Sequence, residues 1–351
     1  MYRNVHYLDS SISFNSSILY LFLLIVKKIL GAGVLVFFMI RVIPGDICLI
    51  RWLDFGTHKD LALLHLCRDE LGLNDPLYLQ FFEFLNGALT LDFGVSMWTG
   101  RPIVEELKLR FELSLQVTIM ATLITIIVAI PLGVISAIRQ NTWIDYIVRT
   151  FSIAGIAVPS FWLGILIILG LLIGTQHIFN EPWMPPISYV PIWEDPIHNL
   201  SQLIWPAVAT GYRFSAVVTR MTRSAMLEVL REDYVRTARS KGLKETVVIN
   251  RHALRNAFLP VITVIGMEFA FFMGGLVVTE QVFNLNGLGS LLVEAVLQAD
   301  YNMIQALAML AVAVFVLVNF VTVSYTHLRA HETLRYLVCR LLVEKERGGG
   351  G

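Results

Sequence analysis

The sequence predicts an all-α membrane protein with six transmembrane helices, and three observations lead to this prediction. Hydrophobic residues make up 56% of the 351-residue chain and charged residues only 15%, whereas soluble domains carry about 25% charged residues. The apolar residues collect into blocks of roughly 20, the length that crosses a hydrocarbon core about 30 Å thick. Basic residues gather in one long segment between two of these blocks. The composition therefore excludes an ordinary soluble enzyme.

The positions of the apolar blocks give the six spans. The first begins after the Lys27–Lys28 pair, since two adjacent lysines are too costly at mid-bilayer on an unpaired helix. Residues 1–28 are then expected to be a cytoplasmic N-terminal segment. Prolines inside later spans are tolerated because neighbouring helices satisfy the freed backbone groups. The expected spans are 29–43, 113–138, 150–174, 200–219, 259–283 and 304–323.

The distribution of charge sets the orientation. Residues 175–199 and 280–303 contain no lysine or arginine, whereas Arg213 to Arg255 carries ten. The positive-inside rule places that basic segment in the cytoplasm together with both termini. The segment 44–112 lies outside, has eleven acidic and six basic residues, and is too long for a simple connector. It is expected to form a small extracytoplasmic cap between the first two spans.

Cysteine and short-motif patterns indicate no metal site and no catalytic centre. Cys48, Cys67 and Cys339 form no CxxC pair and no metal-ligand spacing. Cys48 and Cys67 could form a disulfide if they face an oxidising compartment, but unpaired cysteines are favoured. No HExxH and no GxxxxGK[ST] motif occurs, so the chain has no P-loop for ATP. ATP-driven work would need a separate ATPase.

The segment from Glu232 to Pro260 is a basic, helix-compatible insert that covers most of the cytoplasmic loop expected at 220–258 and the first residues of the next span. One interpretation is a topology anchor. Against it, Gly242 permits a tight turn between two short helices, and apolar residues recur along both of them. These apolar residues are Val235, Ala238, Leu243, Val247 and Val248. A solvated anchor needs no apolar stripe, so we expect the stripe to sit in a groove of another protein.

This insert resembles the cytoplasmic coupling loop of ABC-importer permeases, in particular the subfamily importing dipeptides, oligopeptides and nickel. That subfamily carries a DYVRTAR-KGL run, then HALRNA and a proline, present here at 233–243, 252–257 and Pro260. In the general pattern, an EAA triplet precedes a glycine by three residues, and IxLP begins ten residues after that glycine. Counted from Gly242, only Ala238 and Leu254 match that pattern literally. The positions at which the insert departs from the general pattern carry the residues that the peptide subfamily has there.

Further segments resemble the family in order along the chain, over about Lys27 to Val323. They are RVIPGD at 41–46, NDPL at 74–77, FGVS at 93–96, RPI at 101–103, VPSFW at 158–162, TEQVF at 279–283 and GLG at 287–289. After Val323 the resemblance stops. Residues 324–351 resemble translated sequencing adapter and are expected to be a non-native tail; a genuine basic amphipathic helix is the alternative.

The resemblance implies the type I ABC-importer permease fold, with a five-helix permease core over 113–323. It implies import of di- or oligopeptides across a bacterial-type inner membrane; nickel, opine or glutathione import fits the motifs nearly as well. The implied partners are a second permease subunit in a heterodimer, two ABC ATPases that bind Mg-ATP, and an extracytoplasmic substrate-binding protein. The chain itself would be no enzyme and would bind no cofactor, metal or nucleic acid. A stand-alone secondary transporter or channel would predict internal repeats, and none is evident.

The resemblance also places ATPase coupling on the insert. The expected coupling residues are Glu232, Tyr234, Arg236, Thr237, Ala238, Arg239, Lys241, Gly242, His252 and Leu254. Among them, the packing and hinge positions are Tyr234, Ala238, Gly242 and Leu254, and the rim charges are Arg236, Arg239 and Lys241. Within the spans, Glu268 and Arg213 are candidates for the translocation path, either paired or separate. Ionisable residues at membrane depth usually face the bundle interior, pair or mark a pathway.

Overall fold

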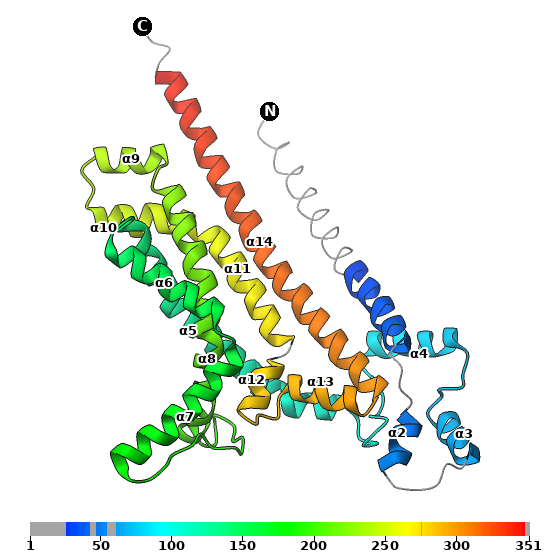
Figure 1. The fold of residues 1–351 in the computed structure, drawn as a ribbon. Helices are drawn as coiled ribbons and strands as arrows, with labels where there is room; N and C mark the ends of the chain where they lie inside the picture. Colours follow the sequence, from blue (N-terminus) through cyan, green and yellow to red (C-terminus); the bar gives the residue numbers. More distant parts are fainter. Residues whose placement is uncertain (1–25, 43–46, 55–60, 275, 348–351) are drawn as a thin grey trace, which may run out of the picture. The chain divides into compact units, whose positions relative to one another are not determined.

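The computed structural model describes residues 26–42, 47–54, 61–274 and 276–347, and these ranges are built of helices (Figure 1). They contain no strand; an isolated bridge joins Val95 to Pro102. The all-helical class predicted from the sequence is therefore confirmed for this part of the chain. Most of the N-terminal segment predicted at 1–28 lies outside the described residues.

The chain divides into two compact units. The first contains Met1–Leu115 and Met273–Val316, and the second contains Gln116–Phe272 and Leu317–Gly351. This division differs from the predicted one, in which a cap at 44–112 stands apart from a core that starts at 113. Met273–Val316, expected in the permease core, instead clusters with the N-terminal part of the chain.

The first unit contains a helix over residues 26–42, then several short helices and the N-terminal part of a long one. The helices are α2 (Ile47–Asp54), α3 (Leu61–Glu70), α4 (Leu77–Thr90), α12 (Val277–Val282), α13 (Leu288–Leu297) and the start of α14 (Tyr301–Arg347). Phe37, Phe84 and Met309 form one buried cluster, in which the Phe37 and Phe84 rings lie 5.8 Å apart. The helix over residues 26–42, α4 and α14 are thus held together by apolar contact.

A disulfide joins Cys48 of α2 to Cys67 of α3. The expectation of unpaired cysteines is therefore wrong. Cys48 is fully buried among Ile47, Met97 and Ala299, so packing of the two short helices brings two cysteines that are 19 residues apart in sequence to bonding distance. Spacing in the sequence does not reveal this contact because it depends on how α2 and α3 pack.

The second unit is built mainly of long helices. Its helices are the C-terminal part of α5 (Ile103–Ile138), α6 (Trp143–Ala157), α7 (Ser160–Phe179), α8 (Pro196–Val229), α9 (Asp233–Ser240), α10 (Glu245–Val247), the π-helix η1 (Val248–Ala253), α11 (Leu254–Met273) and the end of α14. Asp195 is the N-cap of α8. Its carboxylate accepts hydrogen bonds from the N–H groups of Ile197 and His198 at 3.1 and 3.0 Å, which satisfies free donors of the first turn.

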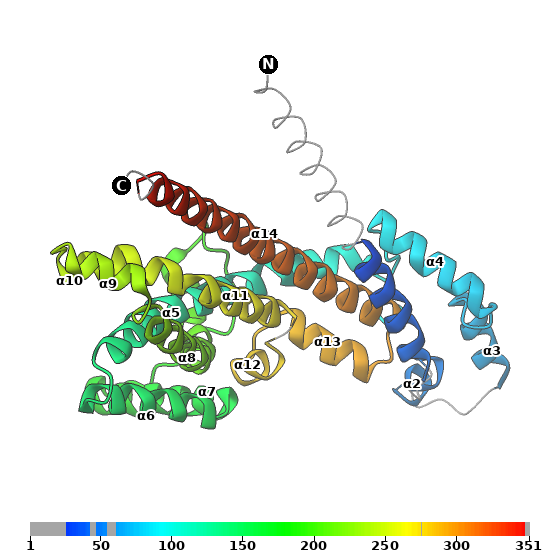
Figure 2. The same cartoon turned by 90° about the horizontal axis from the view of Figure 1, so that it is seen from above.

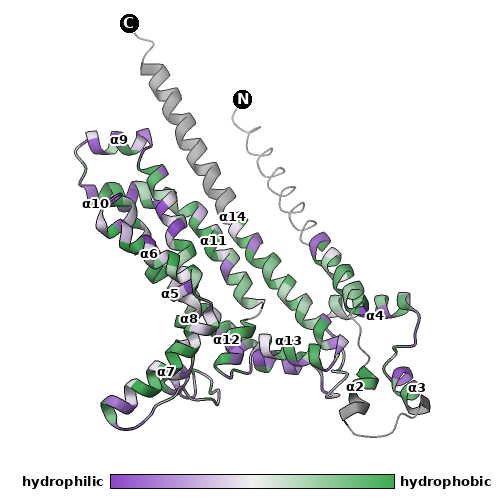
Figure 3. Ribbon diagram, in the orientation of Figure 1, coloured by the Kyte–Doolittle hydropathy of each residue, from purple (hydrophilic) through white to green (hydrophobic). Residues whose placement is uncertain are grey.

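Within the described residues, four helical stretches are long and apolar enough to cross a membrane. They are Ile103–Ile138, Ser160–Phe179, Glu245–Met273 and Tyr301–Tyr325. Figure 3 shows hydrophobic residues concentrated along α7 and much of α14, and hydrophilic residues concentrated on α9. A membrane protein is supported, and the predicted count of six spans goes beyond these four.

The span predicted at 150–174 is broken at Pro159, so α6 ends at Ala157 and α7 begins at Ser160. The residue before a proline is disfavoured in the α region, and Val158 accordingly has an extended ψ of 120°. The span predicted at 259–283 also differs, because α11 ends at Met273, before Gly274. Glycine is among the weakest helix formers.

Candidate functional site

The insert predicted to couple to a partner forms a helical hairpin at the ends of α8 and α11 (Figures 1 and 2). Its turn lies at Gly242, whose φ of +74° falls in the left-handed region that favours glycine. The N–H of Gly242 donates to the Arg239 carbonyl at 2.9 Å, and that of Lys241 to the Thr237 carbonyl at 3.1 Å. These bonds close the end of α9. The predicted tight turn at Gly242 is confirmed.

The apolar stripe of the insert packs largely against its own chain. Val235, Ala238 and Val248 are buried together, in contact with Val229 and Leu230 at the end of α8. The expectation that these three residues face a groove of another protein is therefore wrong. An isolated helix as short as α9 is unstable in water, so it needs this buried face to hold its shape.

Many residues of the hairpin remain exposed, among them Asp233, Ser240, Lys244, Glu245 and Thr246. We call a further set of seven exposed residues the exposed face of the insert. It consists of Glu232, Arg236, Arg239, Lys241, Gly242, Leu243 and Val247. Leu243 and Val247 are 41% and 37% exposed. Arg239 pairs with Glu245 at 2.7 Å, and Arg236 lies 3.7 Å from Asp233. The face combines basic groups with two uncovered apolar side chains, a composition suited to docking on another protein.

The remaining predicted coupling residues support the hairpin from within. The Tyr234 hydroxyl accepts a hydrogen bond from the Asn256 side-chain amide at 2.8 Å, which ties α9 to α11. Burial raises the pKa of the Tyr234 phenol above its ordinary value of about 10. Leu254 packs against the buried core that includes Ala253 and Ala257. Thr237 and His252 are half-buried.

The hairpin enters α11 through the π-helix η1 at Val248–Ala253. The sequence analysis did not predict this element. Turns of π-helix are rare and frequently occur at functional sites. It lies between the turn at Gly242 and α11, within the stretch Glu245–Met273 that is long and apolar enough to cross a membrane.

The two candidates for the translocation path lie in the second unit. Glu268 on α11 is half-buried, and Arg213 on α8 is exposed. No ion pair joins the two among the described residues, so the predicted pairing is not seen there.

A buried ion pair that the sequence analysis missed joins α5, α6 and α8. The fully buried Asp145 carboxylate accepts two hydrogen bonds from Arg223, each 2.8 Å long. Ser136 of α5 donates its hydroxyl to the same carboxylate, and the Asn141 N–H donates at 3.1 Å. The sequence signal for this pair was weak: Asp145 is an acidic residue in the first turn of a helix that follows a short loop.

The Arg223 guanidinium holds the pKa of the Asp145 carboxyl well below its ordinary value, despite the opposing effect of burial. A carboxyl with a lowered folded-state pKa stabilises the protein above its unfolded-state pKa, about 3.9. This stability is lost only as the pH falls below that value. The pair is therefore ionised at physiological pH and acts as a permanent structural link.

In the first unit, a second buried carboxylate caps α13. Glu280 is 1% exposed; it accepts hydrogen bonds from the Ser114 hydroxyl at 2.9 Å and the Ser290 N–H at 2.8 Å. The Ser114 oxygen in turn accepts from the Leu288 N–H at 2.8 Å. A carboxylate here offsets the partial positive charge of the helix N-terminus. This geometry gives a physical reason for the TEQVF and GLG segments.

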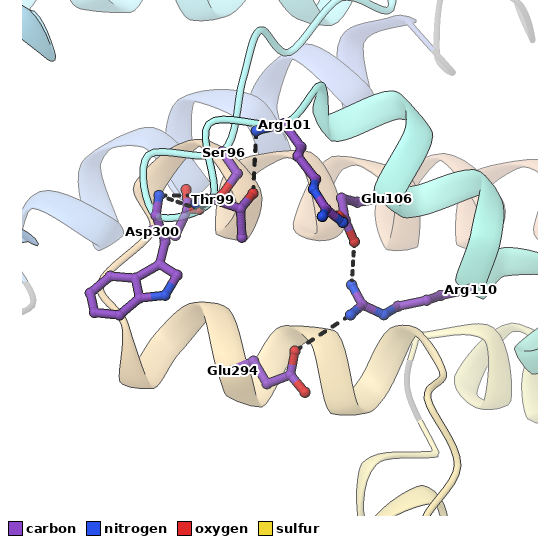
Figure 4. A network of polar contacts seen from close by, with 8 residues as sticks. Ser96, Thr99, Arg101, Glu106, Arg110, Glu294 and Asp300 are labelled. Atoms are coloured by element: carbon purple, nitrogen blue, oxygen red, sulfur yellow. Dashed lines mark hydrogen bonds and ion pairs between the residues drawn. The ribbon is translucent and has the colours of Figure 1, made fainter. Parts of the chain in front are cut away.

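The first unit also contains a polar network around the start of α5 (Figure 4). Glu106 lies 2.9 Å from Arg110 and 3.6 Å from Arg101, and Arg110 extends the chain of charges to Glu294 of α13 at 3.6 Å. The buried Ser96 hydroxyl donates to the carboxylate of Asp300. These contacts tie the 95–102 loop and α5 to α13 and to the residue that precedes α14.

Comparisons with known proteins agree on one family. The profile of the family described as binding-protein-dependent transport system inner membrane component matches residues 129–331. The chain is 36% identical, over 321 residues, to the glutathione transport system permease protein GsiC of Escherichia coli (strain K12), covering 89% of this chain and 98% of that protein. The same protein of Shigella dysenteriae serotype 1 (strain Sd197) gives the same values.

Among solved structures, the chain is similar to one described as an amino acid ABC transporter with histidines. The TM-score is 0.40 with 14% identity, covering 66% of this chain and 93% of that chain. The family match ends at residue 331, a few residues beyond Val323, where the resemblance was expected to stop.

Proposed function

The chain belongs to the family of binding-protein-dependent transport system inner membrane components, and from this premise we propose that it imports di- or oligopeptides. Family membership makes it a permease subunit of an ABC importer in the inner membrane. The observation behind the peptide assignment is the subfamily form of the insert at 233–243 and 252–257. Glutathione is the second candidate, because relatives 36% identical to the chain are glutathione permeases, and glutathione is itself a modified tripeptide.

The exposed face of the insert is the proposed docking surface for the partner ATPases. Leu243 and Val247 would enter an apolar groove while Arg236, Arg239 and Lys241 contact acidic groups at its rim. Closure of the ATPases on Mg-ATP would displace the hairpin and the helices attached to it. Such a shift requires that the face bind the two ATPase states with different affinities. The complex would contain two ATPases, a second permease and a substrate-binding protein.

The proposed topology has six spans, cytoplasmic termini and an extracytoplasmic 44–112 segment. Two independent observations support it. Ten lysine and arginine residues lie between Arg213 and Arg255, which favours the cytoplasm for the insert. The Cys48–Cys67 disulfide favours the opposite compartment for α2 and α3, since structural disulfides persist in oxidising environments.

This topology predicts the labelling of the cysteines. In a Cys339→Ser background and in right-side-out vesicles, a membrane-impermeant maleimide should label Cys48 and Cys67 only after an impermeant reductant has been added. A cysteine introduced at the exposed Lys241 should be labelled only in inside-out vesicles. Labelling of Cys48 in right-side-out vesicles without reduction would contradict the disulfide, and labelling only in inside-out vesicles would contradict the proposed orientation.

The substrate class is tested by uptake into proteoliposomes that contain the complete complex. We expect ATP-dependent uptake of a labelled dipeptide that requires the substrate-binding protein. Labelled glutathione and Ni²⁺ are measured in parallel, and a clear preference for either would replace the peptide assignment. Uptake that persists without ATP or without the binding protein would indicate a secondary transporter or channel instead.

A further inference from the structure

We propose that Asp145 and Arg223 are positioning residues for transport, which hold α6 against α8 so that a displacement of the insert moves both helices as one body. This inference rests on the proposed role of the insert as the ATPase-coupling segment. It concerns a different question: how a movement that begins at the exposed face reaches helices that do not touch a partner ATPase.

The first step is the short path from Arg223 to the insert. Arg223 stands six residues before the end of α8 at Val229, which is about 9 Å along a helix that rises 1.5 Å per residue. Val229 and Leu230 then pack directly against the buried residues of α9, Val235 and Ala238. A continuous series of packed contacts thus leads from the hairpin along α8 to the ion pair.

The second step is the nature of the α6–α8 contact beyond the ion pair. The other buried residues of α6 are Val148, Ser152 and Gly155, which bury little apolar surface. A Cβ added at Gly155 would lie 2.8 Å from the Cβ of Ala216, so the two helices approach closely there. Small residues permit close approach of the two backbones. In the middle of α6, the Tyr212 hydroxyl donates to the Phe151 carbonyl at 3.3 Å, and the two rings lie 4.9 Å apart. The ion pair is a second directional contact, which lies nearer the end of α8 that leads into the insert.

The third step is the geometry of the pair itself. Two parallel hydrogen bonds from one guanidinium to one carboxylate fix angle as well as distance. The Ser136 hydroxyl and the Asn141 N–H donate to further acceptor sites of the same carboxylate. The Asp145 carboxylate therefore also holds the end of α5 and the α5–α6 turn. A buried ion pair is often no more stable than an apolar replacement of the same volume, so its use here points to orientation rather than stability.

The test uses the complete complex in proteoliposomes with its substrate-binding protein loaded with a dipeptide. The main variant is the double replacement Asp145→Leu/Arg223→Leu, because apolar pairs can replace buried ion pairs without loss of stability. We expect it to assemble in normal yield and to hydrolyse ATP. We expect the ATP consumed per dipeptide imported to rise roughly tenfold, as for residues that modulate coupling between sites. Arg149→Ala, on the exposed face of α6, is the matched control and should leave the ratio unchanged.

Two results would overturn the proposal: normal uptake by the assembled double variant, or uptake and hydrolysis that fall in parallel. If the double variant does not assemble, Arg223→Lys answers the same question, since it keeps the charge but loses the paired hydrogen bonds. A raised ratio then supports the positioning role, and an unchanged ratio refutes it. Gly242→Pro is measured alongside. Normal transport in Gly242→Pro would refute the coupling role of the insert. If Gly242→Pro is uncoupled and the double variant transports normally, only the role of the ion pair is refuted.

Discussion

Replacement of Gly242 by proline is expected to uncouple transport from ATP hydrolysis, lowering uptake by at least roughly tenfold while the protein still inserts into the membrane. Gly242 has a φ of +74°, whereas proline holds φ near about −65°. Proline also removes the N–H that donates to the Arg239 carbonyl at 2.9 Å. Both effects open the turn between α9 and α10, so the exposed face loses its shape.

The matched control at this position is Gly242→Asn. Asparagine tolerates the left-handed region better than most residues, and no atom lies within 4 Å of a Cβ built at Gly242. We therefore expect the asparagine variant to retain coupled uptake. The measurements are ATP hydrolysis and dipeptide uptake in the same proteoliposomes. Full uptake by the proline variant would show that this turn does not transmit force.

Gly289→Ala is expected to destabilise the first unit by about 1–3 kcal/mol, the usual cost of overpacking a tight site. A Cβ at Gly289 would lie 2.8 Å from the Cα and the nitrogen of Val277, and backbone atoms cannot move aside as a side chain can. Alanine gains about 0.5–1 kcal/mol over glycine within a helix. The steric term is the larger one, so the net effect is a loss of stability. The measurement is thermal unfolding of the purified permease in detergent.

Gly170→Ala on α7 is the control for this prediction. Nothing lies within 4 Å of a Cβ built there, so only the gain in helix propensity remains, and the melting temperature should stay equal or rise. Gly287→Ala should behave like Gly289→Ala, because its Cβ would meet the Glu280 carboxylate that caps α13. Equal melting temperatures for the Gly289 and Gly170 variants would contradict the proposed packing around this cap.

The helical class and most helix positions were predictable because both depend on local composition. Apolar blocks of spanning length predict helices in any bilayer protein, and α5 and α14 contain the spans predicted at 113–138 and 304–323. The turn at Gly242 was predictable for the same reason, since a glycine between two amphipathic runs has few other uses. Pro159 carried a local signal as well: the residue before a proline leaves the α region.

The partners of buried side chains were not predictable, because they depend on residues far apart in sequence. Val235 and Ala238 had the right periodicity for a docking helix, yet they pack against α8 and Val248. Periodicity identifies an apolar face and says nothing about which surface covers it. Cys48 and Cys67 illustrate the same limit, since a disulfide requires a Cα separation that only the packing of α2 and α3 decides.

The sequence by itself determined that this chain is a helical membrane protein with a turn at Gly242 in a basic insert, because composition, periodicity and turn chemistry are local properties. The permease family came from the resemblance of its motifs. Tertiary structure alone decided which side of the insert stays exposed and which carboxylates are buried. Asp145 and Glu280 are ordinary acidic residues in the sequence. They became structural links only where folding placed Arg223 beside one and the start of α13 beside the other, since a buried charge is stable only with partners that satisfy it.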